Sequence, residues 1–453
     1  MNQVLHIVTA LSLFFLHDTV IGAEHAAVSD MAASCATFIT ESEGIREYKL
    51  SNGLQILILP KSDALNATVN MVYRVGLKNE ADNNIETAHT LEHLLVARST
   101  ALHPDWPEEI KKNNLRRVGN TAQDYTSYKT SVLSTEEKLN WLFAIEAERM
   151  SSFTYSNDDV AGVVAEVIDE RDATERNAQK FFRHKALNLV TGKTEQAPGN
   201  SLTHISLLKL QKFWEEFYLP QRATLVVGSK LEAQLTMELV QKNFCNISKI
   251  TSLKSLEEPK ISSTNFPYNQ EIVKKRSKPI LLLAYRTMGL SDQNFAAIPL
   301  LAHILQKSKL LPLNDQPEQK KSGQIKNVYF TGLLSSGILM IEPVMEYGEQ
   351  KNLPVIKTSL LNTVEKINET PVNENELTLA KESLGRAYKK MSADNEETAV
   401  KLAPYIATGN WQLFFKVRDD IQNFSIFKIQ ENAVKILSPA NRIFMQVSEQ
   451  IDE

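Results

Sequence analysis

The sequence predicts an α+β fold in which one domain occurs twice, each copy being a mostly antiparallel sheet with helices on one face. Two observations predict this class. Each half of the chain reads as strands, then helices, then a closing strand, an order typical of an α/β sandwich. Short segments of the first half also recur in the second half. The 453 residues are 43% hydrophobic and 23% charged, as in ordinary globular proteins.

Three pairs of similar segments indicate the duplication. They are VYRVG (72–76) with AYRTMG (284–289), LEHLL (91–95) with LAHIL (301–305), and YLPQRATLVVGS (218–229) with LSPANRIFMQVS (437–448). The pairs occur in the same order and at a nearly constant offset, for example 212 residues for the first tyrosine (285 − 73). Internal similarity of this kind is the mark of a repeated structural unit.

The repeat sets the expected domain boundaries. We predict a first domain at 45–250 and a second at 265–453. The segment between them, 251–264, is polar and contains proline, which suits a linker. Residues 24–44 read as an irregular lead-in.

The first copy supplies the pattern of elements. Its expected strands are NGLQILILP (52–60), ATVNMVYRVG (67–76) and ATLVVGS (223–229), and its expected helices are 85–99, 136–153 and 158–176. The strands alternate apolar and polar residues or are apolar throughout, whereas the helices repeat apolar residues every three to four positions.

Residues 1–23 read as a cleaved export signal. Val8–Leu16 is an apolar core of suitable length, and Ala23 ends a small-residue cleavage site. The alternative is a short membrane anchor, but Asp18 interrupts the apolar run before it reaches the roughly 18 residues of a membrane span. We therefore expect an exported protein, periplasmic or secreted, with no transmembrane span in the mature chain.

Charge and cysteine content narrow the possibilities further. The formal net charge of −4 and the absence of nucleic-acid motifs argue against nucleic acid as a partner. The two cysteines, Cys35 and Cys245, could pair in an oxidising compartment or remain free thiols.

The segment AHTLEHLL (88–95) carries the clearest chemical signal. On a helix, His89 and His93 lie one above the other, and Glu92 lies beside them. Two imidazoles at this spacing can bind one Zn²⁺, while a nearby carboxylate can take a proton from water. A chance match or a packed histidine pair is the alternative.

A third ligand must come from another part of the chain. In the helix expected at 156–173, Asp159, Glu166 and Glu170 fall together on one rim of an apolar face. Helical geometry does not choose between Glu166 and Glu170, and a rim in contact with solvent remains the alternative for all three.

The motif His-Thr-Leu-Glu-His (89–93) resembles that of the pitrilysin/insulinase family of zinc metallopeptidases, the inverzincins. In that family a later helix carries two acidic residues seven apart, and the second binds zinc. Asp159 and Glu166 have this separation (166 − 159). The resemblance therefore implies Glu166 as the third ligand and Asp159 as a supporting residue.

The resemblance extends over most of the mature chain. KLSNGLQILI (49–58) is similar to the opening strand of the family, and EEFYLPQRATLVVGS (215–229) to its closing strand. The duplicated layout is that of processing-peptidase subunits. By this resemblance, two such subunits close around peptides or unfolded segments.

The substrate-binding residues depart from the family pattern. In NTAQDYTSYKTSV (120–132), Thr126 is kept, but Val132 stands where a tyrosine is usual. The second copy lacks the metal-binding set, and its lone His303 reads as a core residue. Tyr329 matches a tyrosine that contacts substrate, although Ser322 stands where its partner arginine is expected. The resemblance then implies that a partner subunit supplies an Arg/Tyr pair.

Together these features predict a zinc-dependent endopeptidase of the cell envelope, acting as a homodimer or heterodimer. His89, His93 and Glu166 would hold the metal, Glu92 would be the catalytic base, and Thr126 and Tyr329 would contact substrate. A low-activity or non-catalytic binding or assembly subunit of a heterodimeric peptidase is the alternative. A purely structural zinc site fits poorly, because such sites usually have four protein ligands.

Overall fold

The computed structural model describes residues 35–80, 86–112, 115–192, 202, 205–250, 266–274, 278–308, 325–343, 345, 352–368 and 371–449. The expected export signal and linker lie outside these residues, as do residues 24–34 of the lead-in. From Cys35 onward the chain forms one compact unit that contains two sheets. The domain boundaries at 45–250 and 265–453 stay predictions.

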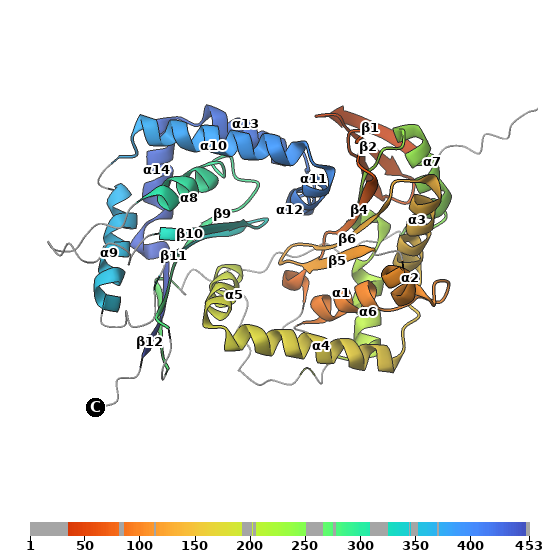
Figure 1. The fold of residues 1–453 in the computed structure, drawn as a ribbon, viewed down its shortest axis with the longest axis horizontal. Helices are drawn as coiled ribbons and strands as arrows, with labels where there is room; N and C mark the ends of the chain where they lie inside the picture. The colour runs from red at the N-terminus through yellow and green to blue at the C-terminus, as the bar shows by residue number, and fades with distance from the viewer. Residues whose placement is uncertain are drawn as a thin grey trace, which may run out of the picture. The chain divides into compact units, whose positions relative to one another are not determined.

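The first sheet has seven strands in the order β1-β2-β3-β7-β4-β6-β5 (Figure 1). In chain order they are β1 (Ala36–Ser42), β2 (Ile45–Leu50), β3 (Gln55–Ile58), β4 (Asn66–Tyr73), β5 (Arg116–Thr121), β6 (Thr126–Leu133) and β7 (Ala223–Gly228). Only β3 and β7 pair in parallel, so the sheet is mostly antiparallel as expected.

One expectation about this sheet is wrong. Residues 36–42 were expected to be irregular, but they form β1, which pairs antiparallel with β2 at the sheet edge. Its side chains are mostly exposed, so the strand lacks the buried apolar pattern by which sequence reveals a strand. A disulfide between Cys35 and Cys245 joins the start of β1 to the end of α7.

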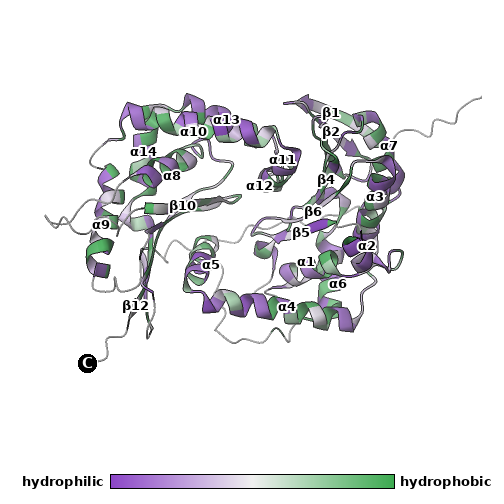
Figure 2. Cartoon of the chain, viewed as in Figure 1, coloured by the Kyte–Doolittle hydropathy of each residue, from purple (hydrophilic) through white to green (hydrophobic). Residues whose placement is uncertain are grey.

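The helices of the first half are α1 (Thr87–Ala97), α2 (Trp106–Lys112), α3 (Glu136–Ser151), α4 (Asn157–Arg176), α5 (Ala178–Thr191), α6 (Leu207–Phe217) and α7 (Ala233–Phe244). Three of them, α1, α3 and α4, match the expected helices to within two residues at each end. Figure 2 shows hydrophilic and hydrophobic residues interleaved along α4, as expected for a helix with one packed face.

The second sheet repeats the order of the first. Its strands are β8 (Tyr268–Lys274), β9 (Ile280–Met288), β10 (Ile325–Gly332), β11 (Ser336–Pro343) and β12 (Arg442–Glu449), arranged β10-β11-β9-β12-β8. This corresponds to β5-β6-β4-β7-β3, and the parallel pair β8/β12 corresponds to β3/β7. The predicted duplication therefore appears in the topology itself.

The helices of the second half are α8 (Ala297–Lys307), α9 (Leu353–Glu365), α10 (Glu374–Ser392), α11 (Asn395–Lys401), α12 (Ala403–Ala407), α13 (Leu413–Asn423) and α14 (Ile426–Ile436). Helix α8 is the counterpart of α1. It carries His303, which is partly buried on a helix whose other residues are apolar up to Leu305.

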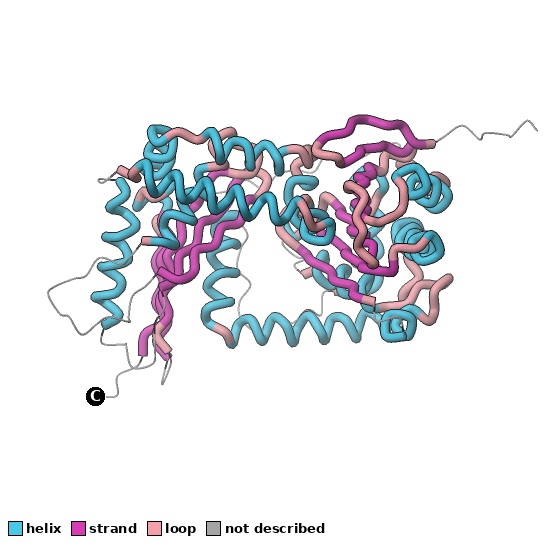
Figure 3. Tube along the Cα trace, turned by 45° about the horizontal axis from the view of Figure 1, so that its top comes forward, coloured by secondary structure: helices cyan, strands magenta, loops and turns pink. Residues whose placement is uncertain are grey.

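Each sheet is covered on its second face by helices from the other half of the chain. Helix α5 turns away from α4 and packs on β9, β11 and β12 (Figures 1 and 3), with Phe182 and Val190 in a common core with Ala284. Reciprocally, α11 and α12 pack on β4 of the first sheet, and α11 also packs on β7. Strand β7 is consequently buried at all six positions.

Polar contacts also join the two halves. The buried Asn70 amide donates to the carbonyl of Ala399 at 2.8 Å. On the other sheet, Arg183 of α5 forms an ion pair with the buried Glu342 of β11 at 2.5 Å. Helix α4, which borders the predicted metal site, is thus followed directly by a helix fixed to the second sheet. Among the described residues, no helix has the length and apolar character that crossing a bilayer requires.

Candidate metal centre

Helix α1 brings the two histidines of the motif together. One face of α1 is buried in the core of the first half, and the opposite face of the helix is turned toward α4. The buried residues are Ala88, Leu91, Leu94 and Leu95. The carboxylate of Glu80 accepts hydrogen bonds from the N–H groups of Glu86 and Ala88, at 3.2 and 2.8 Å. These N–H groups at the start of a helix have no partner within it, so Glu80 stabilises the first turn.

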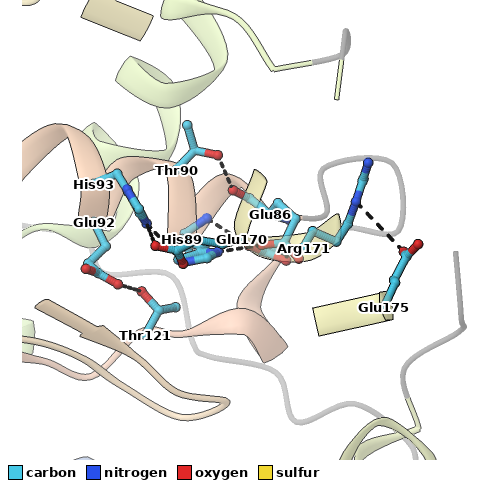
Figure 4. Close-up of polar contacts among 11 residues, drawn as sticks. Glu86, His89, Thr90, Glu92, His93, Thr121, Glu170, Arg171 and Glu175 are labelled. Atoms are coloured by element: carbon cyan, nitrogen blue, oxygen red, sulfur yellow. Dashed lines mark hydrogen bonds and ion pairs between the residues drawn. The ribbon is translucent and has the colours of Figure 1, made fainter. Parts of the chain in front are cut away.

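The geometry of His89, His93 and Glu170 suits a single metal ion. The Nε2 atoms of the two histidines lie 3.3 Å apart, and the Glu170 carboxylate lies 3.6 Å from His89 Nε2 and 3.7 Å from His93 Nε2 (Figure 4). Ligands of a tetrahedral ion held at about 2.0–2.1 Å stand about 3.3–3.4 Å from one another. The three side chains therefore fit Zn²⁺ with little movement.

A second pair of carboxylates holds the outer nitrogens of the histidines. Glu86 Oε2 lies 2.9 Å from His89 Nδ1, and Glu166 Oε2 lies 3.2 Å from His93 Nδ1. Each Nδ1 can donate its proton to a carboxylate, which leaves the Nε2 lone pair free for a metal. Burial lowers the pKa of His89, but the hydrogen bond and charge of Glu86, with Glu92 and Glu170, raise it overall.

The position of Glu166 differs from the one expected. One of its oxygens faces His93 Nδ1, and the other accepts a hydrogen bond from Arg98 at 2.8 Å. Glu170 lies one helical turn further along α4, and its carboxylate, rather than that of Glu166, joins the two Nε2 atoms. In this structure Glu170, rather than the expected Glu166, completes a group of three side chains that could hold one metal ion, and Glu166 contacts the outer nitrogen of His93.

Glu92 lies on the same helix, beside the metal-facing nitrogens. Its side chain is buried, and Oε2 accepts a hydrogen bond from the Thr121 hydroxyl of β5 at 3.0 Å (Figure 4). Burial raises the pKa of the Glu92 carboxyl above its ordinary value, although His89, the Thr121 hydroxyl and His93 act in the opposite direction. A carboxylate with a raised pKa is a stronger base toward water.

Asp159, which was expected to support the metal site, caps the start of α4 in this structure. It lies in the first turn of α4, where its carboxylate accepts from the backbone N–H and hydroxyl of Ser156 at 2.9 and 2.6 Å. The Ser156 hydroxyl accepts in return from the Asp159 N–H. This reciprocal pair is a capping box, which stabilises the start of the helix.

Loss of this cap should affect stability and leave metal binding intact. We expect Asp159→Ala to lower the free energy of unfolding by about 1 kcal/mol, the usual effect of removing a helix cap. Urea denaturation measures this change, and zinc analysis of the folded variant should equal that of the unchanged protein. Ser156→Ala should behave in the same way. Loss of zinc in Asp159→Ala alone would return this residue to the metal site.

Thr126 also has a structural role. It is fully buried in β6, and its hydroxyl donates to the Val75 carbonyl at 2.9 Å. Its hydroxyl is thus engaged within the sheet, and a contact of Thr126 with substrate stays a prediction. The neighbouring strand β5 instead lies at the sheet edge, and its Gly119, Asn120 and Thr121 line the metal pocket.

Tyr329 on β10 has an arginine beside it from the same chain. Arg183 Nη2 donates to the Tyr329 hydroxyl at 3.2 Å, and the guanidinium lies over the tyrosine ring at 4.5 Å. Ser322, where the arginine was expected, lies outside the described residues. An arginine of this chain thus contacts Tyr329 from α5, and no sequence spacing pointed to it. That a partner subunit supplies an Arg/Tyr pair stays a prediction.

A pocket of about 650 Å³ surrounds the candidate metal centre. Its lining includes His89, Glu92, His93 and Glu170 on one side and Phe181 and Asn188 of α5 on the other. Glu92 and the candidate metal-binding atoms thus share one cavity that is large enough for several atoms of a small molecule.

Comparisons with known proteins identify a peptidase family. Residues 56–199 match the family model described as insulinase (peptidase family M16), and residues 204–384 match the model of the peptidase M16 inactive domain. The first match contains the metal centre, and the second contains most of the second sheet. The absence of the histidine pair from α8 agrees with that division.

Two curated relatives are zinc proteases by name. The zinc protease PqqE of Helicobacter pylori is 23% identical over 60% of this chain and 63% of its own length. The probable zinc protease PqqL of Escherichia coli is 24% identical over 49% of this chain and 25% of its own length. The matched stretches thus cover less than two thirds of either relative.

Solved structures share the fold along nearly the whole chain. A protease from Helicobacter pylori superposes with a TM-score of 0.77 at 17% identity, over 91% of this chain and 99% of that chain. The periplasmic protease PqqL from Escherichia coli superposes with a TM-score of 0.71 at 15% identity, over 91% of this chain and 48% of that chain. The chain therefore belongs to the pitrilysin/insulinase family of peptidases, M16.

Proposed function

We propose that this protein is a zinc-dependent endopeptidase that hydrolyses peptides or unfolded segments after export from the cytoplasm. The observation that carries the proposal is the convergence of His89 Nε2, His93 Nε2 and the Glu170 carboxylate within 4.8 Å, with Glu92 in the same pocket. When bound, Zn²⁺ would polarise the carbonyl of the scissile bond and lower the pKa of water.

Side chains of the protein would carry out proton transfer and orient the metal ligands. Glu92 takes a proton from the attacking water and transfers it to the leaving amine. Glu86 and Glu166 orient the imidazoles through Nδ1, and Arg98 holds Glu166 in place. Such outer partners are part of the site, because ring orientation decides where the metal-facing lone pairs point.

The edge strand β5 favours an extended peptide as substrate. Its partner β6 lies on one side, and no further strand of the described chain pairs with its other side. A peptide can add to such an edge through backbone hydrogen bonds, which are independent of side-chain sequence. Because β5 also lines the metal pocket, a peptide in this position would pass the metal centre.

The disulfide supports export. Disulfides persist in oxidising compartments and are rare in the cytosol of mesophiles. The pairing of Cys35 with Cys245 therefore agrees with the expected signal at residues 1–23, and the structural likeness to a periplasmic protease points the same way. We propose the periplasm or the exterior of the cell as its location.

Metal removal tests the function directly. The mature chain should digest a mixed peptide library, lose that activity on treatment with a chelator, and regain it with added Zn²⁺. Mass spectrometry of the products should show internal cleavage. Activity that persists after zinc has been removed would contradict the proposal.

A non-catalytic binding or assembly subunit is the second candidate. It is favoured by the burial of Thr126, which leaves β6 without the hydroxyl expected to hold substrate. In that case the zinc-loaded chain would bind peptides without cutting them. The expected dimer stays a prediction, and light scattering of the mature chain checks it.

A further inference from the structure

The edge strand β5 presents three alternate residues to the helices beneath it. Arg117, Gly119 and Thr121 are spaced two apart, so they lie on the same face of the strand. Gly119 and Thr121 both meet Glu92 of α1, whereas Arg117 contacts Glu146 of α3.

Gly119 leaves the space that the Glu92 carboxylate occupies. A Cβ atom on Gly119 would lie 2.0 Å from Glu92 Oε1, 2.5 Å from Cδ and 2.7 Å from Cγ. Real Cβ atoms essentially never approach other heavy atoms below 3.0 Å. Any other residue at 119 would therefore push the carboxylate out of its present position, toward the metal-facing nitrogens or away from them.

Thr121, on the same face of β5, holds the second oxygen of the carboxylate. Its hydroxyl donates to Glu92 Oε2 at 3.0 Å, and an ionised carboxylate needs such donors when it is buried. The carboxylate is thus confined between a backbone surface at Gly119 and a hydrogen bond at Thr121.

Arg117 keeps the strand in register. Its Nη1 donates to the Thr130 hydroxyl at 2.8 Å and to the Glu146 carboxylate, and both charged side chains are buried. Sliding β5 by one residue would break these contacts and turn Gly119 and Thr121 away from α1. The contact with Glu92 is therefore fixed by the fold of the sheet.

We propose that Gly119 and Thr121 are positioning residues for Glu92, an inference that rests on the proposed function of this site. Neither residue takes part in proton transfer. Together they hold the base in the one orientation from which it reaches the attacking water, and a base that rotates freely spends less time in that orientation.

Thr121→Val removes the hydroxyl while keeping the shape of the side chain. We expect kcat to fall about ten- to a hundredfold, the range for losing one hydrogen bond to a charged group, with KM and zinc content unchanged. Thr121→Ser keeps the donor and should restore kcat to within about threefold. Thr358→Val makes the same change at an exposed position of α9, outside the metal pocket, and is the control that should leave kcat unchanged.

Gly119→Ala tests the space beside the carboxylate. We expect a fall in kcat at least as large as that of Thr121→Val, with zinc still bound. Gly385→Ala on α10 adds the same methyl group where its nearest neighbour is the end of the Gln422 side chain at 3.0 Å, and it should leave kcat unchanged. If Gly119→Ala does not fold, the threonine variants still decide the question.

Crystal structures of the zinc-loaded Thr121→Val and Gly119→Ala variants give a readout that does not depend on activity. The Glu92 carboxylate should be rotated or disordered while both histidines stay in place. An unmoved carboxylate, a change in KM alone, or an inactive Thr121→Ser would overturn the inference. If the unchanged chain cuts no peptide, the proposed function fails, and the position of Glu92 in these crystals still tests the contact.

Discussion

The Glu92→Gln variant should bind zinc normally and lose peptide cleavage. Glutamine keeps the size of the side chain and can still contact Thr121, but it does not accept a proton at neutral pH. Removal of a general base usually lowers the rate by about a hundred- to ten-thousandfold, and we expect kcat to fall within this range. Steady-state cleavage of a fluorogenic peptide measures the loss, and metal analysis measures the zinc.

Glu137→Gln is a suitable control for this experiment. Glu137 is exposed in the first turn of α3, outside the metal pocket, and the substitution makes the same change in charge. Its kcat should equal that of the unchanged protein. Cleavage by Glu92→Gln at the unchanged rate would show that another group is the base.

The second large effect separates Glu170 from Glu166. Glu170→Gln should lose zinc on dialysis against a weak chelator, because one of the three ligands becomes a poor donor. Glu166→Gln should keep zinc with an affinity about 10–100-fold lower, the usual effect of losing an outer partner of a histidine ligand. Competition with a chromophoric chelator measures both affinities.

The opposite result has a clear meaning. If Glu166→Gln loses the metal while Glu170→Gln keeps it, the carboxylate on His93 Nδ1 must move to the metal side when zinc binds. The geometric assignment would then be wrong and the family-based assignment right.

The sequence was sufficient to bring the histidine helix and the acidic helix together, but not to align them. Glu166 and Glu170 lie one turn apart on the same rim of α4, so helical periodicity gives both the same direction. The contacts of Glu166 with Arg98 and of Glu170 with His89 show that α4 runs opposite to α1. The relative direction of the two helices and the offset of one along the other depend on tertiary packing, which no local sequence pattern encodes.

Local sequence patterns also could not predict which helices cover the second face of each sheet. The six residues of β7 are apolar or small throughout, a sign that both faces are buried, yet the pattern does not name what buries them. Helix α5 has an ordinary amphipathic sequence, and nothing in it indicates that Phe182 and Val190 pack against the sheet of the other half. Arg183 therefore reaches Tyr329 through tertiary structure, and no spacing in the sequence links these two residues.

The sequence contains only a weak indication that Gly119 and Thr121 contact Glu92. Gly119 within a strand suggests a close approach of another group, because glycine is unfavourable in strand interiors. The hydroxyl of Thr121 is two residues further along, on the same face of β5. The identity of the approaching side chain emerges only when α1 lies against this strand.

Anomalous diffraction at the zinc edge from crystals of the mature chain would show which side chains hold the metal ion. We expect one strong peak between His89 Nε2, His93 Nε2 and the carboxylate of Glu170, with Glu166 still on His93 Nδ1. A peak coordinated by Glu166, or zinc bound only elsewhere on the chain, would show that the proposed metal site is wrong.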